Sequence, residues 1–394
     1  MLLCAALTLA AASLSAPAMA LSAATLRSKL ASAVRAAGSS SGAYVSDLTA
    51  NRVLYSSRAT VGRIPASNEK LYTTAAALSR FGSRGRLYTD ILTSGAVDPD
   101  GLLSGNIYLR GGGDPTLSTS DINRLAALIK EAGITRIDGG IVADESFLDS
   151  RRGGPASGFY FDGDMGGSLS ALAVNRGLSR VSSPATASAS LLGSRLKKLK
   201  VLRGERTRLG KTPKSADRIA RVSSPPISQL IELINVPSDN FIAEMLIKDL
   251  GARFGSSGST AAGAKVVRSY LRTVGIAPDV SDGSGLSRGN ATSPRQLVTL
   301  LAAIHRSSDK SVFEGSLAVA GRSGTLAARM NGTAAEGRCR GKTGTLNNVS
   351  ALSGLCRAGN GHTIAFSLLM NSFFPADSHK LQDRAAVAIA RYGD

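Results

Sequence analysis

A serine and a lysine three positions apart form the most reactive combination in the sequence. Ser67 and Lys70 lie in the segment 64–78, where a proline precedes the serine by two positions and alanine and leucine follow. This composition predicts the start of a helix, on which side chains three positions apart share one face. A serine hydroxyl needs a base to become a nucleophile, and a desolvated neutral lysine can be that base. The pair therefore predicts acyl transfer, and a helix N-terminus would favour the negative charge that develops.

Two further motifs distinguish this pair from the other Ser-x-x-Lys matches, at 194–197 and 307–310. Ser-Asp-Asn occurs once, at 238–240, and Lys-Thr-Gly occurs once, at 342–344. Ser-x-x-Lys, Ser-Asp-Asn and Lys-Thr-Gly, in this order, are the motif set of penicillin-binding proteins and serine β-lactamases.

Local patterns predict the elements that must position the motifs. A helix follows Ser67, a second helix spans 240–250, and a hairpin turns at Asn347-Asn348 between strands 339–346 and 349–356. Further strands are expected at 42–48, 52–55 and 362–370, and further helices at 227–234, 260–274, 293–305 and 378–392.

The motifs and the sequence around them resemble the bacterial D-alanyl-D-alanine carboxypeptidase/endopeptidase family of low-molecular-mass penicillin-binding proteins. The resemblance covers most of residues 25–392 and includes 109–117, 281–288 and 323–326. It implies an α/β fold of the α+β type, with a β-lactamase/transpeptidase-like core of helices on an antiparallel sheet and an inserted smaller lobe. The expected catalytic domain is 21–85 and 216–394, and the insert is 86–215, reduced relative to the family's usual two extra lobes.

The resemblance also implies the roles of the catalytic residues. Ser67 would be the acylated nucleophile and Lys70 its base. Ser238 and Lys342 would relay a proton to the leaving D-alanine, and Asn240 would orient the substrate amide and Lys70.

The same resemblance implies substrate contacts on the third motif. Thr343 and Thr345, on either side of Gly344, would hold the terminal carboxylate of the substrate. The backbone N–H groups of Ser67 and Thr345 would form the oxyanion hole.

In the insert, Asp144 matches the region where this family has an acidic residue that reads the peptide stem, and Glu145 is the neighbour that could take this role. The other interpretation of Asp144 is an exposed carboxylate at a strand end.

No paired-carboxylate or metal-ligand spacing stands out, so the sequence predicts no metal and no cofactor. None of the histidines sits in a context typical of a catalytic triad: His305, His362 and His379.

Three functions remain open from these residues. The first is a penicillin-binding serine D-alanyl-D-alanine carboxypeptidase/endopeptidase that cleaves peptidoglycan stem peptides through an acyl-enzyme, with β-lactam antibiotics as covalent inhibitors. The second is a serine β-lactamase, although no Glu-x-x-x-Asn lies between 238 and 342 to speed deacylation. The third is a non-catalytic wall-binding protein, which would not need the intact motifs.

The first 20 residues are typical of a secretory signal. Residues 1–26 contain no charged side chain, 2–14 are apolar, and Ala18-Met19-Ala20 resembles a cleavage site. The alternative is an uncleaved anchor. Either predicts an exported protein, in the periplasm or on the extracytoplasmic face.

The chain of 394 residues carries a net charge of +19, densest at 195–214. Because neither zinc-ligand spacing nor stacking aromatics accompany this charge, we expect no nucleic-acid partner. An exported basic surface favours an anionic wall or membrane surface, or serves solubility alone. The stretch 186–217 is expected to be a small inserted lobe or a mobile excursion.

Two cysteines remain beyond the signal, and the predicted hairpin sets them opposite each other. With a two-residue turn at 347–348, Cys339 faces Cys356 at a non-hydrogen-bonded position, where the Cα atoms approach to roughly 4.5 Å. An oxidising compartment would favour a cross-strand disulfide. Two free thiols are the alternative, because a bulge near Gly341 would shift the register.

Overall fold

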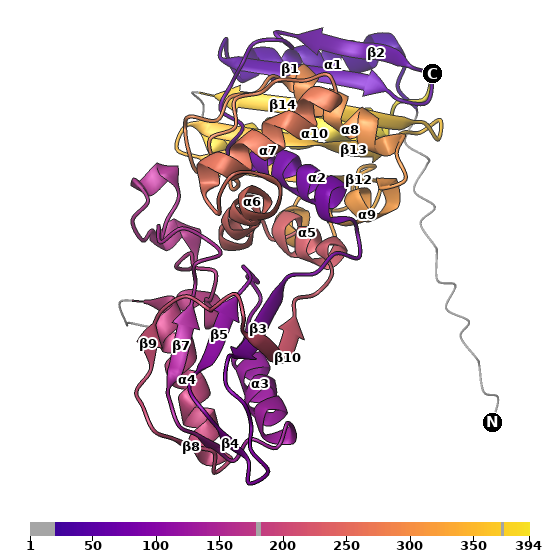
Figure 1. Ribbon diagram of the computed structural model, residues 1–394. Coiled ribbons are helices and arrows are strands. Elements are labelled where there is room, and N and C mark those ends of the chain that lie inside the picture. The colour runs from indigo at the N-terminus through magenta and orange to yellow at the C-terminus, as the bar shows by residue number, and fades with distance from the viewer. Residues whose placement is uncertain (1–19, 179–182, 372–373) are drawn as a thin grey trace, which may run out of the picture.

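The computed structural model describes residues 20–178, 183–371 and 374–394, which form two parts (Figure 1). The predicted signal, apart from its last residue, and Cys4 lie outside the described residues. Segments from both ends of the sequence build the larger part, and the segment between α2 (Lys70–Phe81) and α5 (Ile227–Asn235) builds most of the smaller one. Within the described ranges, no helix combines the length and the apolar character that crossing a bilayer requires.

Over the described residues, the larger part is organised around a six-stranded sheet in the order β11-β12-β13-β14-β1-β2. All its neighbouring strands are antiparallel, and β14 joins the C-terminal strands to the N-terminal ones. This confirms the antiparallel sheet predicted from the sequence. The strands are β1 (Ser41–Asp47), β2 (Arg52–Ser57), β11 (Ala318–Val319), β12 (Cys339–Leu346), β13 (Val349–Arg357) and β14 (Thr363–Asn371).

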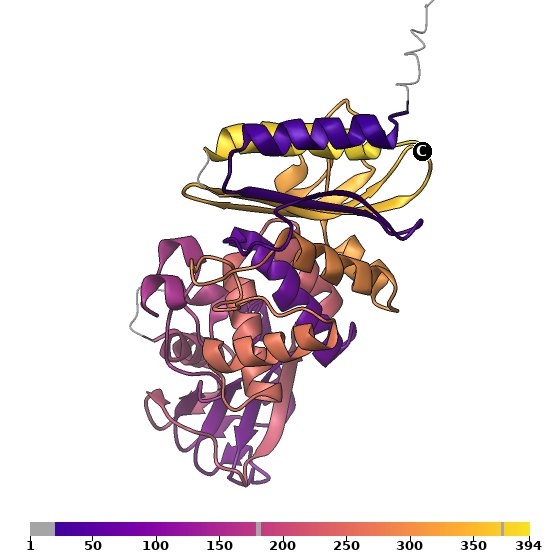
Figure 2. The same cartoon turned by 90° about the horizontal axis from the view of Figure 1, so that it is seen from above.

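Helices cover both faces of this sheet (Figure 2). On one face α1 and α10 lie side by side, and their buried Leu30 and Ile389 belong to one hydrophobic cluster with the sheet. On the other face α2 contacts α5, α6 and α7, and every residue from Lys70 to Leu78 is buried. The helices are α1 (Ala23–Ala36), α2 (Lys70–Phe81), α5 (Ile227–Asn235), α6 (Asn240–Phe254), α7 (Thr260–Thr273), α8 (Pro294–His305), α9 (Lys310–Gly315) and α10 (Pro375–Ala390).

The smaller part, at the bottom of Figure 1, has its own hydrophobic core around a mixed sheet of order β10-β3-β5-β7-β9. A second short sheet has the order β4-β6-β8. The helices and strands of the smaller part are β3 (Tyr88–Thr93), β4 (Leu102–Leu103), β5 (Ile107–Gly111), α3 (Thr119–Glu131), β6 (Arg136–Ile137), β7 (Ile141–Asp144), α4 (Pro184–Lys198), β8 (Leu202–Arg203), β9 (Arg208–Leu209) and β10 (Asp217–Ser223).

The structure corrects two expectations about this smaller part. Within the stretch 186–217, α4 is no mobile excursion, because it buries Ala189, Leu192 and Leu196 in the core of the smaller part. The predicted boundary at residue 215 assigns β10 to the catalytic domain, whereas β10 pairs with β3 in the sheet of the smaller part. Both differences arise from pairing and packing between segments far apart in the sequence, which local patterns do not contain.

Candidate active site

Ser67 and Lys70 meet where a short 3-10 turn, η1 (Ala66–Glu69), runs into α2. The helix therefore begins at Lys70 and not at Ser67 as the sequence predicts. The Lys70 ammonium is fully buried, and its Nζ lies 3.0 Å from Ser67 Oγ, 2.6 Å from Asn240 Oδ1 and 2.6 Å from the carbonyl oxygen of Ser284. The first two motifs, distant in sequence, thus converge on one nitrogen atom.

Burial makes Lys70 a stronger candidate for a base than an ordinary lysine. Desolvation lowers the pKa of Lys70 to about 8, although carboxylates of Asp282, Glu244, Asp239 and Glu69 act in the opposite direction. A charged amine is costly to bury, so Lys70 loses its proton at lower pH than an ordinary lysine, and about a tenth of the amine is already neutral at pH 7.

The second motif lies at the start of α6. Asp239 is the N-cap of this helix, accepting from the backbone N–H of Ile242, and pairs with Arg176 of the segment between α2 and α5. Ser238 has a φ of 67°, in the left-handed region, and is half-buried. The Asn240 side chain spans the site, because its Oδ1 accepts from Lys70 and its Nδ2 donates to the Asp164 carbonyl oxygen, 2.7 Å away.

The third motif lies on β12, directly beside η1. The side-chain amide of Asn68 donates to the Lys342 carbonyl oxygen, 3.1 Å away. A Cβ at Gly344 would lie 2.7 Å from the Pro65 carbonyl oxygen and 3.1 Å from the Ser67 nitrogen, so only glycine lets the strand come this close. The structure thus brings all three motifs together.

The side chains of β12 around this glycine differ in exposure. Lys342 is fully buried, and desolvation, reinforced by the charge of Lys70, lowers its pKa well below the ordinary value. Thr343 Oγ1 donates to Thr325 Oγ1, 2.8 Å away, while Thr345 is exposed.

Asp144 does not join the three motifs. It is buried, not exposed at a strand end, and its two oxygens accept from the backbone N–H groups of Ser146 and Thr212 at 2.9 and 2.7 Å. Glu145 forms an ion pair with Arg152 and accepts from Ser170. Both carboxylates therefore have partners inside their own segment, and the contact of Asp144 with the stem peptide stays a prediction.

Three buried carboxyl groups around Lys70 are site features that the sequence reasoning missed. Glu69, Glu244 and Asp282 are each at most 1% exposed. Desolvation raises the pKa of all three, that of Glu244 to about 7. Glu244 follows Asn240 by one helical turn, which is the one local signal that could have placed it beside the site.

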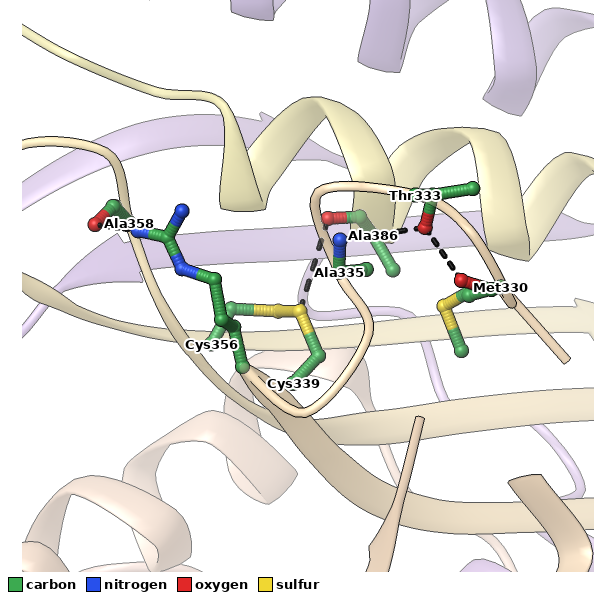
Figure 3. The surroundings of a disulfide bond; sticks show 8 residues. Met330, Thr333, Ala335, Cys339, Cys356, Ala358 and Ala386 are labelled. Atoms are coloured by element: carbon green, nitrogen blue, oxygen red, sulfur yellow. Dashed lines mark hydrogen bonds between the residues drawn. A yellow bond between two sulfur atoms is a disulfide. The ribbon is translucent and has the colours of Figure 1, made fainter. Parts of the chain in front are cut away.

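The strand that carries the third motif is also joined to its neighbour by a disulfide (Figure 3). Cys339 and Cys356 pair across β12 and β13, and their Sγ atoms are bonded at 2.05 Å. Their Cα atoms lie 4.0 Å apart, near the distance that the hairpin register predicts. Ala335 and Ala386 lie next to the bond, in the core between the sheet and α10.

Reducing this bond is expected to destabilise the protein without abolishing activity. For a loop of this length, the entropy gained by the unfolded chain corresponds to about 3 kcal/mol. We therefore expect a lower melting temperature in reductant, and no effect of reductant on a variant with both Cys339→Ser and Cys356→Ser. Thiol counting on unreduced, denatured protein beginning at residue 21 would find no free thiol. Two thiols per chain would contradict the bond.

The pKa of Lys70 predicts how acylation depends on pH. A base must be neutral, and below a pKa of about 8 the neutral fraction of Lys70 falls about tenfold per pH unit. The second-order rate of acylation by a penicillin is therefore expected to rise from pH 6 to pH 8 and level off above. Stopped-flow measurement across this range checks it, and a rate that stays constant from pH 6 to 9 would contradict a lysine base.

Comparisons with known proteins agree with this geometry. The model of the D-Ala-D-Ala carboxypeptidase 3 (S13) family matches residues 23–165 and 164–392. The D-alanyl-D-alanine carboxypeptidase of Actinomadura sp. (strain R39) is 29% identical, covering 90% of this chain and 82% of the relative. The carboxypeptidase DacB of Mycolicibacterium smegmatis is 30% identical over 87% of this chain and 79% of the relative.

Solved structures share the fold. The crystal structure of penicillin binding protein 4 (dacB) from Haemophilus influenzae has a TM-score of 0.82 and 21% identity. The match covers 93% of this chain and 99% of the other. A further structure of that protein is a complex with a β-lactam. The expected α/β fold class and the family resemblance carried by the motifs are both confirmed.

Proposed function

The chain belongs to the D-Ala-D-Ala carboxypeptidase 3 (S13) family and is a penicillin-binding serine-type DD-peptidase, and we propose that it cleaves peptidoglycan stem peptides through an acyl-enzyme on Ser67. The observation that carries this proposal is the coordination of the buried Lys70 amine. Its two shortest contacts are carbonyl oxygens, which accept its two N–H groups when the amine is neutral. The lone pair is then left for the third contact, the Ser67 hydroxyl.

In the proposed acylation, Ser67 Oγ attacks the carbonyl carbon between the two D-alanines and its proton passes to Lys70 Nζ. The oxyanion is stabilised by the backbone N–H groups of Ser67 and Thr345, worth roughly 3–4 kcal/mol per donor in other enzymes. As the C–N bond breaks, Ser238 and Lys342 relay a proton to the leaving amine. Water then hydrolyses the ester and frees Ser67.

The proposed substrate contacts use the third motif. Thr343 and Thr345 would hold the terminal carboxylate, with Gly344 bringing them to the serine. Asn240 would orient the substrate amide with its Nδ2 group. Since Asp164 now accepts from that group, a substrate amide must replace this contact. When the leaving amine belongs to a neighbouring stem peptide and not to free D-alanine, the same steps give endopeptidase action.

A fluorescent penicillin and two peptides test this function. We expect persistent labelling of one site per chain, together with release of D-alanine from a pentapeptide monomer or cleavage of a cross-linked dimer. Rapid loss of the label with hydrolysed penicillin in solution would favour a β-lactamase. Absence of both labelling and peptide cleavage would favour a non-catalytic wall-binding protein.

We also propose a domain division adjusted to the strand pairing. Residues 21–85 and 224–394 would form the catalytic domain and 86–223 the insert, with residues 1–20 as an export signal. Work on peptidoglycan requires an extracytoplasmic location, such as the periplasm. Fractionation of cells that express the full chain would test this, and a cytoplasmic active enzyme would contradict it.

The basic stretch 195–214 would contact an anionic wall polymer or membrane surface. This part comprises the end of α4, the short strands β8 and β9 and the connections between them, where charged side chains such as Lys198, Lys200 and Arg206 are exposed. Sedimentation with anionic against neutral vesicles, and with purified wall, tests this contact. Equal binding to both kinds of vesicle and no salt-sensitive binding to wall would contradict it.

A further inference from the structure

A loop that carries no catalytic motif supplies one of the contacts of the Lys70 amine. The carbonyl oxygen of Ser284, in the loop 281–288, lies 2.6 Å from Lys70 Nζ. In the acylation proposed above, this oxygen decides where an N–H group of the neutral amine points, and therefore where its lone pair points. The group that holds this carbonyl oxygen in place therefore also orients the lone pair of Lys70 toward Ser67.

The group that holds it is the side chain of Glu244. Its Oε1 accepts from the backbone N–H groups of Gly283 and Ser284, both at 2.8 Å. Thr73 on α2 adds a further bond by donating to the Gly283 carbonyl oxygen, 3.0 Å away. Since Glu244 lies on α6 one turn after Asn240, one helix directs both carbonyl oxygens that contact the Lys70 amine.

Glu244 is more than an ordinary structural acceptor. It is fully buried, and among the described residues its second oxygen, Oε2, has no hydrogen-bond partner. A Cβ added at Gly154 would lie 3.5 Å from Oε2, so the segment between α2 and α5 closes over this oxygen. A buried carboxyl group with an unpartnered oxygen costs stability, and in Glu244 this cost is borne beside Lys70.

The loop itself is held from inside by Asp282. Its oxygens accept from the backbone N–H groups of Gly285 and Ser287 and from the side chain of Asn290, at 2.6 to 2.8 Å. Gly285 has a φ of 85°, and a Cβ there would lie 1.9 Å from the Ala66 carbonyl oxygen. Asp282 therefore sets the shape of the loop, and Glu244 attaches the loop to the helix that bears Asn240.

We propose that Glu244 is a positioning residue for the DD-peptidase reaction, fixing the Ser284 carbonyl against the Lys70 amine and placing a negative charge beside that amine. This inference rests on the proposed function, in which Lys70 is the base. Above the Glu244 pKa of about 7, the charge stabilises the ammonium form, so it keeps Lys70 protonated to higher pH than burial alone would. Other ionisable groups face the same space: Asp282, Glu69, Asp239, Lys248 and Lys342.

Two substitutions separate the hydrogen bonds from the charge. Glu244→Gln keeps an oxygen that accepts from both N–H groups but removes the charge, so the rate at high pH should stay within about threefold of wild type. The rising part of its acylation rate at low pH, the acid limb of the pH–rate profile, should move to lower pH, because Lys70 loses a negatively charged neighbour. Glu244→Leu removes the acceptor as well, and should lower the acylation rate constant about 10- to 100-fold with little change in the initial non-covalent binding of penicillin.

Asp249→Asn is the matched control, because Asp249 lies on the same helix, is fully buried and also has unpartnered oxygens within the described residues. It is not among the carboxylates acting on Lys70. Its acid limb should coincide with that of wild type, and melting temperatures identify any variant that does not fold. If Glu244→Leu does not fold, the acid limb of Glu244→Gln alone decides the proposal.

An unshifted acid limb in Glu244→Gln, or an equal shift in Asp249→Asn, would overturn the proposal. A folded Glu244→Leu protein that acylates at the wild-type rate would also overturn it. The outcome is separable from the proposed function, because a Ser67→Ala protein that still acylates would refute that function. An inactive Ser67→Ala protein with an unshifted Glu244→Gln profile would refute only this inference.

Discussion

Ser67→Ala is expected to lose penicillin labelling entirely and to lower D-alanine release by at least about 10⁴-fold, the scale seen when a serine nucleophile is removed from other hydrolases. Among the described residues, Ser67 supplies the one hydroxyl oxygen hydrogen-bonded to Lys70 Nζ, at 3.0 Å, so no neighbouring hydroxyl is placed to replace it. Labelling on a gel and D-alanine release from a pentapeptide measure the two effects.

The chain provides two matched controls for this substitution. Ser194 and Ser307 each precede a lysine by three positions, and both are exposed. Ser194 donates to a backbone carbonyl oxygen within α4, and Ser307 donates to one at the end of α8. Ser194→Ala and Ser307→Ala should label like wild type. If either control lost labelling while Ser67→Ala kept it, the nucleophile would lie in another segment and not at Ser67.

Lys70→Arg is expected to lower the acylation rate by about 10²- to 10⁴-fold while the protein stays folded. Arginine keeps the positive charge but does not lose its proton in proteins, so it cannot accept the Ser67 proton. Stopped-flow acylation measures the rate, and thermal unfolding shows whether the larger side chain has disturbed the core.

Lys248→Arg controls for the added bulk, since Lys248 is also buried and pairs with Asp149 at 2.6 Å. It should lose stability to a similar extent but keep its acylation rate. Wild-type acylation in Lys70→Arg would remove Lys70 from the role of base, whereas an equal loss in Lys248→Arg would attribute the effect to packing.

The parts of the site that could be read from the sequence depend on local geometry. The spacing of Ser67 and Lys70 brings them together on one turn, even though that turn is 3-10 and the α-helix begins at Lys70. The two-residue turn likewise fixes the register of β12 and β13, which pairs Cys339 with Cys356. The order of the three motifs along the chain does not by itself place them in one site. The resemblance to a known family implied the fold that brings them together.

The parts that could not be read depend on contacts between distant segments. Nothing around Ser284 indicates that its carbonyl oxygen contacts Lys70, because the contact uses the backbone and not the side chain. Glu244 looks like an ordinary polar position of a helix until α6 is seen packed against both α2 and the loop 281–288. Asp144 ends a strand, as predicted, but its neighbours in the fold bury it and occupy its oxygens.

Mass spectrometry of the penicillin-treated protein, after digestion, identifies the residue that penicillin acylates. We expect a single penicilloyl adduct, carried by the peptide that contains Ser67 and located on that serine. An adduct on Ser194, Ser307 or any other residue, with the Ser67 peptide unmodified, would contradict it.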